Sequence, residues 1–228
     1  DGFRTAALDP DWASRLNDNW LWPLNWSRVL DGGLNDRDRL AGHLDEVVFG
    51  GRRLSDLRAV PLVLINATEL YTGAPFAFAS PWFDAICSDG RSMLVADAVA
   101  SSMAVPLGFR PTILASYAGT CAHPLPEWVA PTAGDRSAPI VVRETARAFQ
   151  AYRKPEDMTF LHLADGGVVD NFGLANLTTL RRAGGDPHAP FSARDAVRMR
   201  TLTFIVVNAE MTTSADWAST AKGPDGAQ

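Results

Sequence analysis

One stretch decides both the fold and the candidate site of this chain: Leu161-His162-Leu163-Ala164-Asp165-Gly166-Gly167-Val168-Val169-Asp170-Asn171. An apolar run, predicted as a short strand over residues 159–163, delivers Asp165 to a point where Gly166 and Gly167 let the backbone turn. A helical segment follows. A carboxylate at a strand end is positioned to act on a ligand in a crevice. Asp-Gly-Gly is also a common structural turn, so this stretch alone leaves both interpretations open.

Helical and strand patterns around this stretch predict an α/β domain. We expect helices over residues 36–48, 92–103 and 141–152, and a further helix that begins near Leu174 and ends at Gly184-Gly185. Continuous apolar runs predict buried strands over residues 60–65 and 201–208. Because these strands are separated by helices, the sequence predicts a largely parallel central sheet.

The composition is that of one globular domain or part of one. The 228 residues are 46% hydrophobic and 21% charged, which excludes wholesale disorder. The net charge of −5, without a Lys/Arg cluster, gives no reason to expect nucleic acid as a partner. No apolar run approaches the ~20 residues that span a bilayer, and no signal peptide is visible. We divide the chain into a Trp-rich lead-in (1–35), an α/β body (36–210) and a polar tail (211–228).

The histidines, serines and potential metal ligands of the chain do not form the catalytic patterns of other enzyme classes. The strand pattern turns His162 away from Asp165, so a histidine-based triad is not predicted. The chain has no G-x-S-x-G motif, and Ser101 and Ser102 lie in a small-residue helix where packing explains them. Metal-ligand spacings are absent, and no cofactor is expected. Asp170 could pair with Asp165 as in a glycosidase, but it precedes a helix and is better explained as a cap.

The two cysteines leave their redox state and the compartment open. Cys87 and Cys121 are too few for a disulfide framework. We expect buried free thiols, although the two could pair in an oxidising compartment. The sequence predicts no compartment.

The Trp-rich lead-in has two interpretations. Trp20, Trp22 and Trp26 either roof the core or contact lipid, since indole rings favour the headgroup level of a bilayer. In the second case we expect peripheral membrane contact through these three side chains.

Four stretches, in order along residues 40–180, resemble motifs of patatin-like phospholipases. Residues 65–73 (INATELYTG) resemble I-N-A-T-D-L-x-T-G, with Glu69 where that family has Asp. Residues 96–106 (ADAVASSMAVP) resemble its A-V-x-A-S-x-A-x-P helix end, and residues 109–111 (FRP) its F-P-P. Residues 165–171 resemble its D-G-[AG]-x-x-x-N motif, which covers Gly166, Gly167 and Asn171. Residues 44–49 also resemble a helix found upstream of the N-A-T strand.

This resemblance implies a three-layer α/β/α domain that hydrolyses fatty-acyl esters with a Ser–Asp dyad. Asp165 falls on the aspartate of the dyad, and the substrate would be a lipid or another acyl ester. The family's oxyanion segment and its G-x-S-x-G lie before the region covered here. We therefore expect a fragment, incomplete at its N-terminus, that is inactive alone. The alternatives are a non-catalytic lipid- or protein-binding module on the same scaffold and, more remotely, a carboxylate-based glycosidase.

Overall fold

The computed structural model describes residues 33–57, 61–121, 124–184 and 193–198 of the chain. A four-stranded sheet with the order β3-β2-β6-β5 forms its centre. The strands are β2 (Asn66–Glu69), β3 (Ala74–Ala77), β5 (Thr112–Ala115) and β6 (Phe160–Asp165). A separate parallel pair consists of β1 (Gly33–Asn35) and β4 (Leu107–Phe109).

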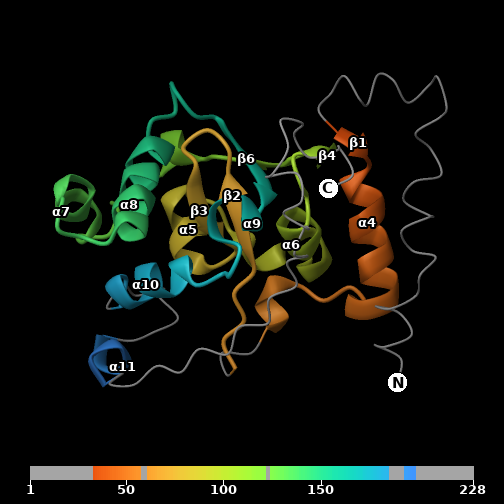
Figure 1. Cartoon of the computed structure of the whole chain (residues 1–228), viewed down its shortest axis with the longest axis horizontal. Coiled ribbons are helices and arrows are strands. Elements are labelled where there is room, and N and C mark those ends of the chain that lie inside the picture. Colours follow the sequence, from red (N-terminus) through yellow and green to blue (C-terminus); the bar gives the residue numbers. More distant parts are fainter. Residues whose placement is uncertain (1–32, 58–60, 122–123, 185–192, 199–228) are drawn as a thin grey trace, which may run out of the picture.

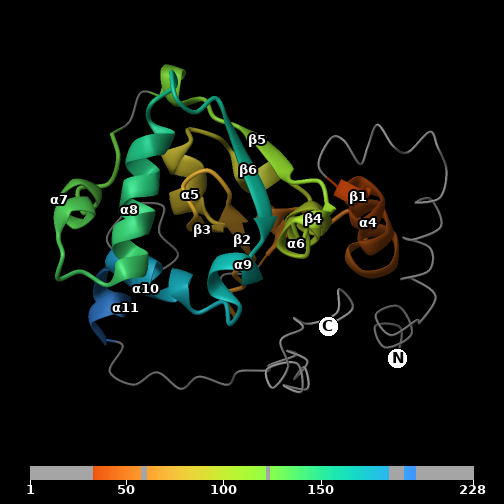
Figure 2. The ribbon, with the colours of Figure 1, turned by 45° about the horizontal axis from the view of Figure 1, so that its top comes forward.

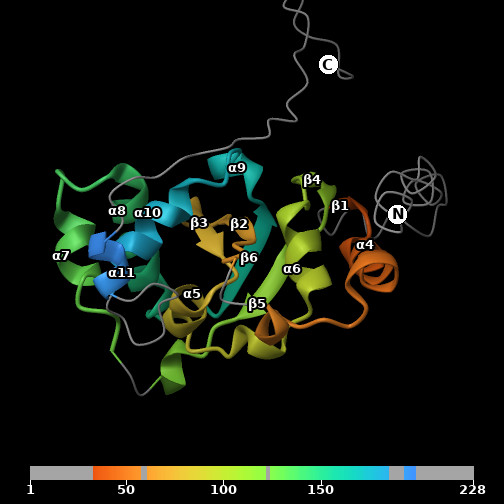
Figure 3. The same cartoon turned by 90° about the horizontal axis from the view of Figure 1, so that it is seen from below.

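Helices lie on both sides of this sheet. The α-helices are α4 (Arg37–Leu44), α5 (Ser80–Ala85), α6 (Val95–Ser102), α7 (Val129–Gly134), α8 (Ile140–Tyr152), α9 (Gly167–Asp170), α10 (Ala175–Arg182) and α11 (Ala193–Arg198). Helices α7, α8 and α10 lie on one side, whereas α6 and then α4 lie on the other (Figures 1 and 3). The predicted α/β class with helices on both sides of a central sheet is confirmed.

The direction of the strands differs from the largely parallel sheet that we expected. Strand β6 pairs antiparallel with both β2 and β5, and β2 pairs antiparallel with β3. Only residues 70–73 separate β2 from β3, and a parallel pair needs a crossover of a dozen residues or more. The four strands of the described sheet are therefore antiparallel. Figure 2 shows β5 and β6 running side by side, with α9 following the end of β6.

The predicted helices are confirmed with small shifts in their ends. The Asp36 side chain accepts the Asp38 N–H at 3.0 Å and so caps α4. This helix continues as a π-helical turn, Asp45–Phe49, which ends at Gly50 with φ +59°. Helices α6, α8 and α10 lie within or close to the other three predicted ranges.

The predictions missed the start of one strand and two short helices. Residues 61–65 are irregular, and the strand begins at Asn66 instead. Helices α5 and α7 lie outside the ranges that were predicted to be helical. Pro81 and Pro131 both lie in the first turn of their helices, where a missing N–H costs nothing.

Three predictions concern parts of the chain that lie outside the described residues. They are the strand over residues 201–208, the polar tail over residues 211–228, and the roofing or lipid-contacting role of Trp20, Trp22 and Trp26. The description begins at Gly33, after all three tryptophans. Both interpretations of Trp20, Trp22 and Trp26, roofing of the core and contact with lipid, therefore stay predictions.

The main core lies between the sheet and helices α5 and α8. Trp82, Phe149 and Tyr152 are fully buried there beside Leu161 and Leu163 of β6. The Trp82 and Phe149 rings meet edge to face at 5.9 Å between centroids, a favoured aromatic geometry. This packing fixes one face of β6 and hence the position at which the strand delivers Asp165.

The two cysteines form a disulfide, which corrects our expectation of free thiols. The turn after α5 and the turn at residues 118–120 lie side by side, since the Tyr117 N–H donates to the Ile86 carbonyl at 2.9 Å. The Cα atoms of Cys87 and Cys121 are consequently 5.5 Å apart, within the usual range for a disulfide. A separation of 34 residues in sequence gave no sign of this proximity.

Candidate active site

Asp165 ends strand β6, as the sequence predicted, and is partly exposed. Its Oδ1 accepts the N–H of Gly167 at 2.7 Å, which folds the carboxylate back over its own turn. Its backbone N–H donates to the carbonyl of Ala104 at 2.9 Å. Both the main chain and the side chain of Asp165 are therefore held in place. No described residue donates a hydrogen bond to its second oxygen, Oδ2.

Gly166 is required at this turn by close contact with the neighbouring strand. A Cβ atom added there would lie 2.8 Å from the backbone oxygen of Asn66 and 3.0 Å from its carbonyl carbon. At Gly167 an added Cβ would lie 3.0 Å from Asn171 Oδ1 and 3.1 Å from Asp165 Oδ1. Both glycines thus serve the close approach of neighbouring groups rather than an unusual backbone angle.

Asp170 is the last residue of α9 and bonds to the start of α10, as expected of a residue that stabilises a helix start, although the N-cap residue of α10 is Leu174. Asp170 Oδ2 accepts the N–H of Ala175, the first residue of α10, at 2.6 Å. An acceptor at this position satisfies one of the free amide groups at the start of the helix. Asp170 also lines the same pocket as Asp165, but its hydrogen bond gives it a structural task.

Asn66 and Asn176 fix the segment that follows the Asp165 turn. Asn66 Nδ2 donates to the Gly173 carbonyl at 3.3 Å, and its Oδ1 accepts from Asn176 Nδ2 at 3.0 Å. The next residue, Ala67, pairs with Asp165 across β2 and β6. The sequence indicated Asn66 only as part of a motif and gave no prediction for Asn176. A polar residue shortly after Asp-Asn-Phe and on the face of the Leu180 stripe was the available signal.

The end of α6 completes the framework. The Ser102 carbonyl accepts the Gly166 N–H at 3.4 Å, and Ser102 lines the pocket beside Asp165. Ser101 is fully buried; its hydroxyl donates to the Asp97 carbonyl at 2.7 Å and shares a hydrogen bond with Thr112. These contacts agree with the predicted packing role of Ser101. His162 is exposed and points away from the buried Leu161 and Leu163.

The pocket beside Asp165 has a volume of about 450 Å³. Polar groups of Asn66, Asp165 and Asn171 lie along it together with apolar groups, among them Leu64, Val99, Met103 and Phe172. Val168 and Val169, on α9 directly after the turn, are 54% and 41% exposed. A carboxylate beside apolar walls is an arrangement that can hold an ester with an aliphatic chain.

Glu69, the residue where the resemblance has Asp, is fully buried and structural. Its carboxylate accepts the N–H groups of Tyr71 and Thr72 at 2.9 and 2.8 Å, and the Thr72 hydroxyl at 2.6 Å. These bonds hold the turn between β2 and β3. Burial, with the nearby Glu69 carboxylate, raises the pKa of the Tyr152 phenol well above its usual range.

The described residues contain no group of three or more His, Cys, Asp and Glu side chains that could hold a metal ion. None of the described helices combines the length and apolar character that crossing a bilayer requires. In this part of the chain no serine hydroxyl hydrogen-bonds to Asp165. The described site therefore consists of a fixed carboxylate, backbone contacts and a pocket with both polar and apolar lining.

Comparison with known families shows which family the chain belongs to. The model of the family described as Patatin-like phospholipase matches residues 3–178. This range includes the Asp165 turn, strand β2 and the end of α6. The match covers well over half of the 228 residues. The chain belongs to the patatin-like phospholipase family, a family of lipid acyl hydrolases. No curated protein and no solved structure matches the chain.

Proposed function

We propose that the parent protein hydrolyses acyl esters of lipids with a Ser–Asp dyad in which Asp165 is the base. The observation that carries this proposal is the geometry of the Asp165 carboxylate. Oδ1 is fixed by the Gly167 N–H at 2.7 Å, whereas Oδ2 accepts no hydrogen bond from a described residue. Oδ2 is therefore available to a serine hydroxyl, and the apolar part of the adjacent pocket, with Leu64, Val99 and Phe172, is available to an acyl chain.

The reaction follows from these groups. Asp165 takes the proton of the serine hydroxyl while the serine oxygen attacks the ester carbonyl, and the alcohol leaves with a proton. Water then cleaves the acyl-enzyme and releases the fatty acid. A carboxylate with an ordinary pKa of about 3.9 is a weak base, so the rate depends on positioning and on donors that stabilise the oxyanion.

The 228 residues contain no G-x-S-x-G motif. The proposal therefore assigns the nucleophile and the oxyanion donors to a part of the parent protein outside these residues. It follows that the 228-residue chain alone does not hydrolyse esters. Asn66, Gly166, Gly167 and Asn171 act by positioning the Asp165 turn.

The test compares the parent protein with its Asp165→Asn variant, using a chromogenic acyl ester and a fluorophosphonate probe. Asparagine keeps an acceptor for the Gly167 N–H but is no base, so we expect kcat to fall by roughly 10²- to 10⁴-fold without loss of stability. Asp157→Asn, an exposed aspartate after α8, is the matched control and should leave kcat unchanged.

Two results would contradict the proposal. Full activity in the Asp165→Asn variant would remove Asp165 from the reaction. A parent protein that neither labels with the fluorophosphonate nor cleaves the ester would favour the alternative function, a non-catalytic lipid- or protein-binding module on the same scaffold.

The membrane form of that alternative depends on Trp20, Trp22 and Trp26. If these indole rings contact the headgroup region, the chain should float with liposomes, and replacing all three tryptophans with alanine should abolish flotation. Flotation that is unchanged in the triple variant would rule out their role in membrane contact.

A further inference from the structure

A second pocket, separate from the Asp165 pocket, lies where α7, α8 and α10 meet. Its volume is about 460 Å³, and it shares no lining residue with the pocket beside Asp165. Its polar lining comes from Thr132, Ser137, Thr178, Arg181 and Arg182, with Asp135 beside them. Three residues with a hydroxyl group and two arginines thus line a common space.

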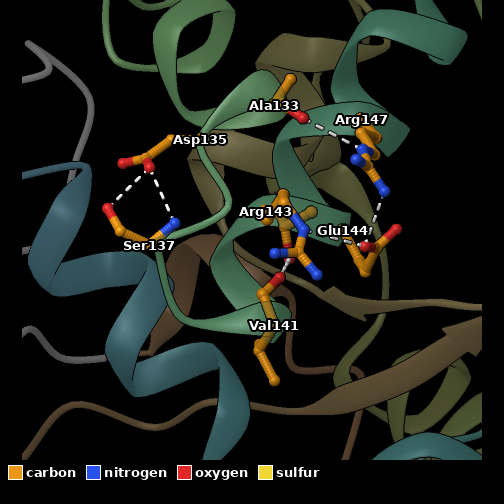
Figure 4. A network of polar contacts seen from close by, with 8 residues as sticks. Ala133, Asp135, Ser137, Val141, Arg143, Glu144 and Arg147 are labelled. Carbon is orange, nitrogen blue, oxygen red and sulfur yellow. Dashed lines mark hydrogen bonds and ion pairs between the residues drawn. The ribbon is translucent and has the colours of Figure 1, made fainter.

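The two arginines supply positive charge that the described protein does not neutralise by direct contact. Arg181 and Arg182 are exposed in the last turn of α10, and neither forms an ion pair or hydrogen bond with any described residue. By contrast, Arg143 and Arg147 on the nearby helix α8 both pair with Glu144 (Figure 4). Arg181 and Arg182 therefore differ from the neighbouring arginines of α8, which are paired.

The one carboxylate in the pocket is already engaged. Asp135 Oδ1 accepts the N–H of Ser137 at 2.8 Å and its hydroxyl at 2.6 Å, within the turn that precedes α8 (Figure 4). These two bonds, together with the charge of Arg182, lower the pKa of the Asp135 carboxyl. Two guanidinium groups against one carboxylate leave the pocket with a net positive charge.

The start of α8 adds backbone donors. Pro139 and Val142 line the pocket, and Pro139 is the N-cap residue of this 13-residue helix, with no side-chain cap. The first amide groups of a helix have no partner within it, and they carry the positive end of the helix dipole. The pocket therefore lies beside the positive end of this helix, at Pro139 and Val142, as well as beside the arginines of α10.

Thr132 gives an independent sign of a missing acceptor. Its side chain lines the pocket, it is 2% exposed, and its buried hydroxyl has no hydrogen-bond partner in the described protein. A buried hydroxyl without a partner is costly, so most find one in the protein or in a bound ligand. This hydroxyl is enclosed by protein, so an oxygen-rich ligand in the pocket supplies that partner once the Thr132 side chain turns its hydroxyl toward the pocket.

We propose that this pocket binds a phosphate group, either as the free anion or as the headgroup of an anionic lipid. Guanidinium groups match the oxygens of phosphate in geometry, and the start of a helix is a ready-made anion site. Apart from Asp135, the polar side chains that line the pocket can all donate hydrogen bonds, and two of them are cationic, which suits a phosphate anion. The proposal does not depend on Asp165 or on ester hydrolysis.

The test uses calorimetric titration of the parent protein with inorganic phosphate. We expect saturable binding that weakens by roughly tenfold to a hundredfold in Arg181→Ala/Arg182→Ala, because a hydrogen bond to a charged group contributes about 1.5–3 kcal/mol. The control is Arg39→Ala/Arg52→Ala, which removes two exposed arginines elsewhere and should leave the affinity unchanged. Thr132→Val, which removes only the hydroxyl, should weaken binding severalfold.

Flotation with phosphatidylcholine vesicles, with or without phosphatidic acid, distinguishes the two sources of phosphate. Binding to phosphatidic acid that needs Arg181 and Arg182 and is reversed by inorganic phosphate identifies a lipid headgroup. Phosphate binding without vesicle binding identifies the free anion. The proposal is overturned if phosphate does not saturate the protein and vesicle binding does not need the arginines, or if the control variant loses as much affinity as Arg181→Ala/Arg182→Ala. Folding of each variant is verified by its melting temperature without phosphate.

Discussion

Substitution of Gly166 by alanine tests how the Asp165 turn is held. The added methyl carbon would lie 2.8 Å from the backbone oxygen of Asn66 and 3.0 Å from its carbonyl carbon. Both atoms belong to the main chain of β2, which cannot rotate away as a flexible side chain can. Gly166 has φ −62°, an angle that alanine adopts freely. Gly166→Ala therefore introduces a steric contact without backbone strain.

The expected magnitude follows from this contact. An extra methyl group in a packed site costs about 1–3 kcal/mol of the free energy of unfolding. Gly42 in helix α4 is a matched control, because an added Cβ there meets nothing within 4 Å. Gly42→Ala should stabilise the protein by about 0.5–1 kcal/mol, since alanine is the better helix former. The same chemical change thus has opposite signs at the two positions.

Thermal unfolding and urea denaturation measure both variants. A change of 1 kcal/mol shifts the melting temperature of a protein of this size by about 2–4 °C. We therefore expect Gly166→Ala to melt about 2–12 °C below the unmodified protein, and Gly42→Ala about 1–4 °C above it. If Gly166→Ala were as stable as the unmodified protein, β2 and the turn would not be in the close contact described, and the positioning argument would fail.

Three further outcomes are expected. Asp170→Ala removes the cap of α10 and should lower the free energy of unfolding by about 0.5–2 kcal/mol in urea denaturation; an unchanged value would show that the cap contributes nothing. Reduction of the Cys87–Cys121 disulfide, which closes a loop with a separation of 34 residues, should cost about 3–4 kcal/mol by chain entropy, measured by urea denaturation with and without reductant. Burial beside Glu69 raises the pKa of Tyr152 in the folded protein, so the stability that depends on the neutral phenol is full below its ordinary pKa of about 10 and falls as the pH rises above it. The phenolate absorbance of Tyr152, taken as the difference from Tyr152→Phe, should therefore appear only as the protein unfolds at alkaline pH.

Local chemistry explains what could be predicted from the sequence. Periodic apolar residues and end signals located α4, α8 and α10, because those signals act within a few residues of the chain. The role of Asp170 followed in the same way, since a cap and its helix are neighbours in sequence. The strand that ends at Asp165 was recognised from its apolar run and the glycines after it.

Relations between distant segments could not be predicted in this way. The antiparallel direction of the sheet depends on which strands become neighbours, and β2 pairs with β6, which lies far along the chain. The disulfide and the Asn66–Asn176 hydrogen bond likewise join segments with no local signal of each other. Helices α5 and α7 were not predicted, because a proline can either end a helix or lie in its first turn.

The motifs that carried the family resemblance therefore lie where three backbone segments meet: β2, the end of α6 and the end of β6. The contacts are the Ala67–Asp165 pairing, the Asp165 N–H to the Ala104 carbonyl, and the Gly166 N–H to the Ser102 carbonyl. Gly166 is needed because the Cβ atom of any other residue would collide with the backbone of Asn66 in β2.

Asp165 differs from these residues, because its structural bond to Gly167 uses only one carboxylate oxygen, and the amide oxygen of asparagine can accept the same bond. If Asp165 is only structural, the Asp165→Asn variant should keep both its stability and its esterase activity. If Asp165 is catalytic, the variant should keep its stability and lose its activity, and this difference between the two measurements makes the substitution decisive.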